Sequence, residues 1–181
     1  MSDVGDQELE AVLKAYDQDH EDHEVVIRQA ADAGAQYDTR FRQVIASVIR
    51  PYFEDVALQL EAHGHTSLVE EGTVSSPDPR RAGASKITLA FLPKARARQS
   101  LRHQLELNDA PHLMLRCDTL KGVIELFQEP DPGFNGDDVV LRSTWQIEEV
   151  TRDNLRKRVL LMVREELVPG SLEYSSFARW T

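Results

Sequence analysis

The chain has 181 residues, of which 41% are hydrophobic and 29% charged, and its formal net charge is −10. This composition is typical of a globular domain with a sizeable core. The acidic balance argues against nucleic-acid binding, which needs Lys and Arg to neutralise phosphates. The longest apolar run has five residues, 159–163, far short of the roughly 20 of a membrane span, and no secretory signal is recognisable. We therefore expect neither a nucleic-acid partner nor a membrane.

Charge is segregated along the chain. Residues 1–39 hold eleven acidic residues against Lys14 and Arg28, a net charge of −9, whereas residues 80–105 hold seven basic residues and no acid. Either these two segments contact each other within the molecule, or each binds a partner of opposite charge. A single cysteine, Cys117, excludes an intrachain disulfide and agrees with a reducing cytoplasm.

An acidic helical arm is predicted at the N-terminus. Helical spacing of apolar residues predicts an amphipathic helix over residues 6–16; its members are Leu9, Val12, Leu13 and Tyr16. Residues 17–24, DQDHEDHE, follow without an apolar side chain. An unbroken helix would place His20 and His23 on the inward stripe with Leu9, whereas a break would make the octet a surface loop.

The same octet could be read as a metal site, because imidazole and carboxylate ligands suit zinc or iron. Its two histidines, His20 and His23, are three residues apart, however, and the zincin pattern needs them four apart. A di-iron bundle would need two Glu-x-x-His copies, and the sequence has none. We predict that the histidines are helix residues beside carboxylates four positions away, with no metal and no cofactor.

A stronger helical pattern follows from residue 37. Its broad apolar face runs from Phe41 to Leu60, and Pro51 should kink or split the helix. The pair His63-Gly64 marks the end, with glycine suited to a left-handed cap.

After Gly64 the period of the apolar residues changes to two, which predicts strands. The expected strands are 66–74, 85–92, 100–107, 112–118, 122–129 and 139–149. Residues 94–107 are ambiguous between strand and helix, and we favour a strand at 100–107. In the last strand we expect Val139, Leu141, Trp145 and Ile147 to face inward.

A C-terminal helix is expected at 152–168, with Thr151 as its N-cap. Its segment 159–163 is apolar on all sides and should be covered on two of them. The predicted fold is α+β: an antiparallel meander of about six strands, with N-terminal helices and a C-terminal helix packed on one face. We divide the chain into an acidic helical arm, 1–36, and an α+β domain, 37–181.

No catalytic residue is predicted. Cys117 shares a strand face with Leu113 and Leu115, and a thiol buried in apolar surroundings is inert. The basic stretch lacks the glycines of a phosphate loop. The C-terminal tail contains four large apolar residues, Leu172, Tyr174, Phe177 and Trp180. Burial of such side chains is favourable in free energy, so we expect them either to complete the protein's own core or to bind to another subunit or protein.

These features favour a non-catalytic, cytoplasmic protein-interaction module, an adaptor or small chaperone-like protein, which forms a homodimer. The residues expected to bind an acidic protein partner or an anion are Arg96, Arg98 and Arg102, with Phe177 and Trp180 as apolar anchors. The alternative is a binder of, or enzyme acting on, a small anionic amphiphile held between the sheet and the C-terminal helix.

Overall fold

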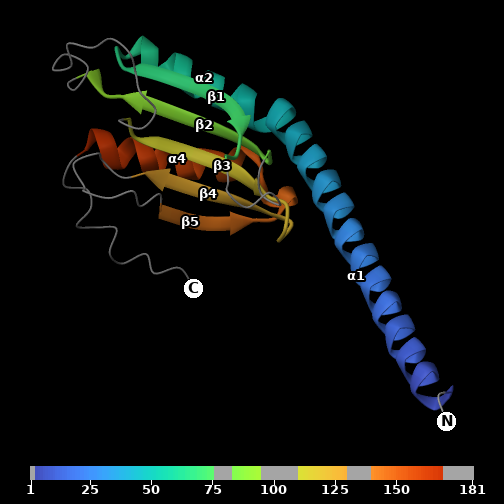
Figure 1. Cartoon of the computed structure of the whole chain (residues 1–181). Coiled ribbons are helices and arrows are strands. Elements are labelled where there is room, and N and C mark those ends of the chain that lie inside the picture. Colours follow the sequence, from blue (N-terminus) through green and yellow to red (C-terminus); the bar gives the residue numbers. More distant parts are fainter. Residues whose placement is uncertain (1–2, 76–82, 95–109, 130–139, 169–181) are drawn as a thin grey trace.

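The computed structural model of the chain describes residues 3–75, 83–94, 110–129 and 140–168, and shows an α+β fold (Figure 1). A long N-terminal helix is followed by a five-stranded antiparallel sheet and a C-terminal helix. In chain order the elements are α1 (Asp3–Val44), the π-helical η1 (Ile45–Ile49), α2 (Arg50–Ala62), β1 (Thr66–Thr73), β2 (Ser85–Leu92), β3 (His112–Asp118), β4 (Val123–Glu129), β5 (Val140–Trp145), the 3₁₀ helix η3 (Ile147–Glu149) and α4 (Arg152–Leu167).

The sheet is a meander in which each strand pairs with its sequence neighbour, in the order β1-β2-β3-β4-β5. Antiparallel neighbours can be joined directly, without the crossover helix that parallel strands need. The described part of the chain therefore has five strands, and the predicted count of about six is wrong. The expected strand at 100–107 lies outside the described residues.

Strand β5 departs from the predicted alternation. Trp145 pairs with Ile124 and Leu141 pairs with Phe127, because the register shifts between Leu126 and Phe127. Ile124 and Phe127 are three residues apart and point to opposite faces of β4, so their partners do too. Trp145 is accordingly 9% exposed and Leu141 45% exposed. The bulge, which no periodicity reveals, makes the expected inward orientation of Leu141 wrong. Trp145 and Ile147 are buried in the core as predicted, although the strand ends at Trp145. Val139 lies outside the described residues.

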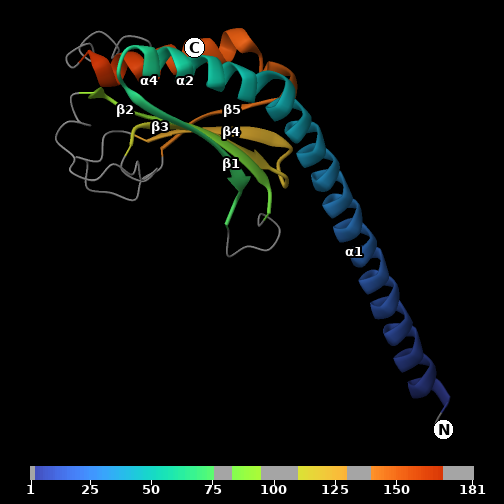
Figure 2. The ribbon, with the colours of Figure 1, turned by 90° about the horizontal axis from the view of Figure 1, so that it is seen from above.

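The core lies between the sheet and the helices α2 and α4, which Figure 2 shows on the same side of the sheet. Alternate strand residues face these helices and are fully buried; they include Ile87, Leu89, Leu113, Leu115, Ile124 and Leu126. The helices contribute further buried side chains, among them Phe41, Ile49, Phe53, Leu155 and Met162. The α4 N-cap is as predicted, since the Asn154 N–H donates to Thr151 Oγ1 at 3.3 Å.

The junction of α1 and α2 explains the role of Pro51. The chain passes through the π-helical η1, and Pro51 stands in the first turn of α2. Val44, Ile49 and Arg50 all keep right-handed helical dihedral angles. The helix therefore changes type next to Pro51 without an interruption of the helical backbone. Helix α2 ends at Ala62, and Gly64 adopts a positive φ of 83°. The predicted glycine cap is confirmed.

Candidate interaction surface

Helix α1 runs far beyond the domain to which it belongs (Figures 1 and 2). It is unbroken from Asp3 to Val44, so the octet 17–24 is helical. Every residue from 9 to 33 is exposed, and the next residue, Gly34, is buried. These exposed residues, 9–33, lie within the predicted N-terminal arm 1–36, and from here on the word arm means residues 9–33. At 1.5 Å per residue the arm is about 37 Å long.

One side of the arm carries exposed apolar residues. Leu9, Val12, Leu13 and Tyr16 are each between 54% and 65% exposed. His20 and His23 continue the stripe of Leu9, but they also face solvent, because the domain begins only at Gly34. The expected inward orientation of the histidines is therefore wrong. His20 instead lies beside Glu24, with Nδ1 and Oε1 3.7 Å apart.

The part of α1 that follows the arm is attached to the sheet through the buried carboxylate of Asp38. Asp38 accepts a hydrogen bond from the Ser85 backbone N–H at 2.7 Å and pairs with Arg42 at 2.8 Å. Arg42 also donates to the Ser85 hydroxyl at 2.7 Å. One turn earlier, a Cβ on Gly34 would lie 3.0 Å from the backbone oxygen of Thr119. Glycine thus allows α1 to cross the β3–β4 turn closely.

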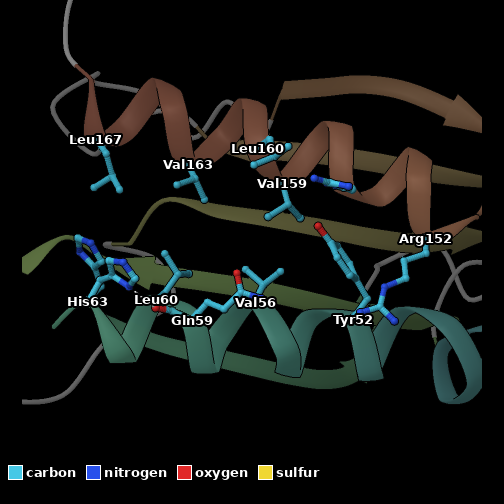
Figure 3. Close-up of a pocket in the computed structure, with 12 residues that line it drawn as sticks. Tyr52, Val56, Gln59, Leu60, His63, Arg152, Val159, Leu160, Val163 and Leu167 are labelled. Carbon is cyan, nitrogen blue, oxygen red and sulfur yellow. Dashed lines mark hydrogen bonds between the residues drawn. The ribbon is translucent and has the colours of Figure 1, made fainter.

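A groove of about 490 Å³ runs between α2 and α4 (Figure 3). Figure 3 shows side chains of both helices pointing toward one another across it. Its apolar lining includes Val56, Leu60, Val159, Leu160 and Val163. Leu160 is 55% exposed, so the outward side of the all-apolar segment of α4 remains uncovered. The groove is the half-open space that this segment leaves beside α2.

The charged side chains among the described residues that line the groove are basic. Of the twelve described residues that line it, none is acidic, although the chain carries −10 overall. Arg152 lies at one end, where its Nη2 pairs with Asp55 at 2.6 Å. Arg156 also lines the groove and makes no ion pair with another described residue. Burial raises the pKa of Tyr52, and both arginines oppose that rise.

One of the two histidines that line the groove, His65, is held in its uncharged form by its surroundings. The Lys94 backbone N–H donates to Nδ1 of His65 at 3.1 Å, which requires that nitrogen to be unprotonated. Burial and the neighbouring Lys94 lower the pKa of His65 below its ordinary value. Both effects favour the uncharged ring. Arg152 already pairs with Asp55, so the unpaired positive charge among the described groove-lining residues is that of Arg156.

The residues that the sequence singled out for binding lie elsewhere in the chain. Arg96, Arg98, Arg102, Phe177 and Trp180 are outside the described residues, so their roles remain predictions. The sequence missed the groove because its walls come from helices about 100 residues apart in the chain. The one available signal was the all-apolar segment 159–163.

The structure shows where Cys117 lies and whether the described residues form a metal-binding group. Cys117 is 3% exposed, and burial together with Asp38 and Asp118 raises the pKa of its thiol to about 12. Its predicted burial is confirmed. Within the described ranges, no group of three or more His, Cys, Asp or Glu is arranged to hold a metal ion. Over the same ranges, no helix combines the length and apolar character that crossing a bilayer requires.

Comparison with known proteins adds no functional information. No protein-family model matches the chain, and no curated protein or solved structure is significantly similar to it.

Proposed function

We propose that this chain is a non-catalytic, cytoplasmic protein-interaction module that acts as a homodimer and uses the arm as its contact element. The observation that carries this proposal is the exposure of all residues from 9 to 33 on a continuous helix, with large apolar side chains among them. An isolated helix in water gains little stability from its backbone alone. An apolar stripe on such a helix is stabilised when a partner covers it.

The rest of the described chain supports binding rather than chemistry. The Cys117 thiol is buried and its pKa is raised to about 12, so it is a poor nucleophile. A buried thiol is also compatible with the reducing cytoplasm. The predicted basic residues Arg96, Arg98 and Arg102, with Phe177 and Trp180, would give the module a second contact, with an acidic protein.

Self-association of the purified chain tests the proposal. Leu9→Gln with Leu13→Gln keeps good helix formers while it removes the apolar stripe. We expect sedimentation velocity to show a concentration-dependent dimer for the wild type and a monomer for the double variant. Val25→Gln is the matched control, because Val25 is 50% exposed and lies on the opposite side of the helix from Leu9 by the 3.6-residue period. Wild-type protein that stays monomeric at all concentrations would contradict a homodimer.

A further inference from the structure

We propose that the groove between α2 and α4 is the docking site for the arm of a second copy of this chain. The inference rests on the proposed function and deepens it by naming the surface that receives the arm. The structure shows both surfaces: an exposed apolar stripe on α1, and a largely apolar groove of about 490 Å³ between α2 and α4.

Arm and groove are complementary in polarity and in charge. Residues 9–24 contain six acidic residues and Lys14, a net charge of −5 with histidines neutral. Among the described residues, the groove lining is mostly apolar and contains no acidic side chain. Its two arginines are Arg156 and Arg152, the second of which also pairs with Asp55. An acidic amphipathic helix laid into it would place apolar residues on the lining and carboxylates toward the arginines.

The shape of the groove favours a helix over a small ligand. Two helices, α2 and α4, form its sides on the same face of the sheet (Figures 2 and 3). Helix α4 has 16 residues and is therefore about 24 Å long, which matches four turns of a docked helix. Leu160 is 55% exposed, and a helix that fills the groove would cover it.

The arm must come from another molecule. Helix α1 is continuous from Asp3 to Val44 and leads away from the domain (Figure 1). Buried contacts fix its direction at Asp38 and Gly34. Folding the arm back onto its own groove would break backbone hydrogen bonds of the helix. A second copy can supply its arm without any such change, and two copies can do so reciprocally in a closed dimer.

Mixing two defective variants tests this pairing. The arm variant carries Leu9→Gln and Leu13→Gln and keeps its groove. The groove variant carries Arg156→Gln and Leu160→Gln, both at exposed positions, and keeps its arm. We expect each variant alone to self-associate at least tenfold more weakly than the wild type. Mixed together they should form a heterodimer, measured by fluorescence anisotropy of one labelled variant, because one intact arm then meets one intact groove.

The matched control for the groove variant is Leu58→Gln with Arg164→Gln. Both residues are exposed, on α2 and α4 respectively, and neither lines the groove. This control should self-associate like the wild type. Circular dichroism of every variant should match the wild type, so that a loss of association is not a loss of folding.

The outcomes separate this inference from the proposed function. If the arm variant is monomeric but the groove variant dimerises normally, the arms pair with each other; the inference is then overturned and the interaction module stands. A mixture no more associated than either variant alone also overturns it. A small anionic amphiphile is the competing occupant. Sodium dodecanoate that binds the groove without weakening the wild-type dimer would show that the arm does not lie there.

Discussion

Asp118 illustrates how a single buried carboxylate shapes the turn between β3 and β4. Burial alone would raise its pKa, but the N–H groups of Leu120 and Lys121 donate to Oδ1 at 3.0 and 3.1 Å. The Lys121 ammonium lies 3.2 Å from Oδ2. Together these contacts hold the pKa of Asp118 below its ordinary value of 3.8. The charged form is thus stabilised in the folded protein.

The pH dependence of this contribution follows from the lowered pKa. We expect Asp118→Asn to lower the free energy of unfolding at pH 7 by about 1–2 kcal/mol, because the amide cannot pair with Lys121 as a carboxylate does. The difference in the free energy of unfolding between the two proteins should persist above about pH 5. It should shrink as the pH falls below the pKa of Asp118 in the unfolded chain and then through its lower pKa in the folded protein, because Asp118 in the wild type becomes protonated. Urea titrations of both proteins at several pH values measure it; a difference that grows in acid would contradict the assignment.

At the scale of elements, one carboxylate joins α1 to β2. Asp38 is buried, and it satisfies the Ser85 N–H and pairs with Arg42. We expect Asp38→Ala to lower the free energy of unfolding by about 1–3 kcal/mol, because it leaves a buried donor without a partner. Asp32→Ala is the control, since Asp32 lies exposed on the arm. Equal effects of the two substitutions in urea would show that the Asp38 contacts do not secure α1.

Most individual helices and hairpins could be predicted, because their signals are local. The Thr151 cap, the Gly64 stop and the β3–β4 hairpin depend on residues within a few positions of one another. The predictions fail where the conformation depends on residues that are far apart in the sequence. The bulge between β4 and β5 put Leu141 and Trp145 on opposite faces, and a strand's own alternation cannot reveal a register shift in its pairing.

At the scale of the whole molecule, arm docking is a balance between apolar burial and the entropy of association. Each buried Leu or Val contributes about 1.5–3 kcal/mol, whereas association costs about 4–15 kcal/mol. With Leu9, Val12 and Leu13 already partly covered by their own helix, one arm in one groove barely offsets this cost. Two reciprocal contacts in a closed dimer offset it better, which favours a dimer over an open chain.

The salt dependence of dimerisation distinguishes an arm docked in a groove from two arms packed against each other. An acidic arm in a groove that carries the unpaired Arg156 is attracted electrostatically, and salt screens this attraction. We therefore expect the dissociation constant of the dimer to rise several-fold between 50 and 500 mM NaCl in sedimentation equilibrium at about pH 7.5. Two acidic arms packed together would repel, and salt would then strengthen the dimer instead.

The sequence by itself determined the α+β class, most element boundaries, the burial of Cys117 and the segregation of charge, because periodicity, caps and composition are properties of neighbouring residues. Only the tertiary structure decided that the stripe through Leu9 and His20 faces solvent. The same stripe would be a core face if a domain lay beside it, and periodicity does not say what covers a helix. The groove likewise exists only because the sheet holds α2 and α4 side by side with space between them.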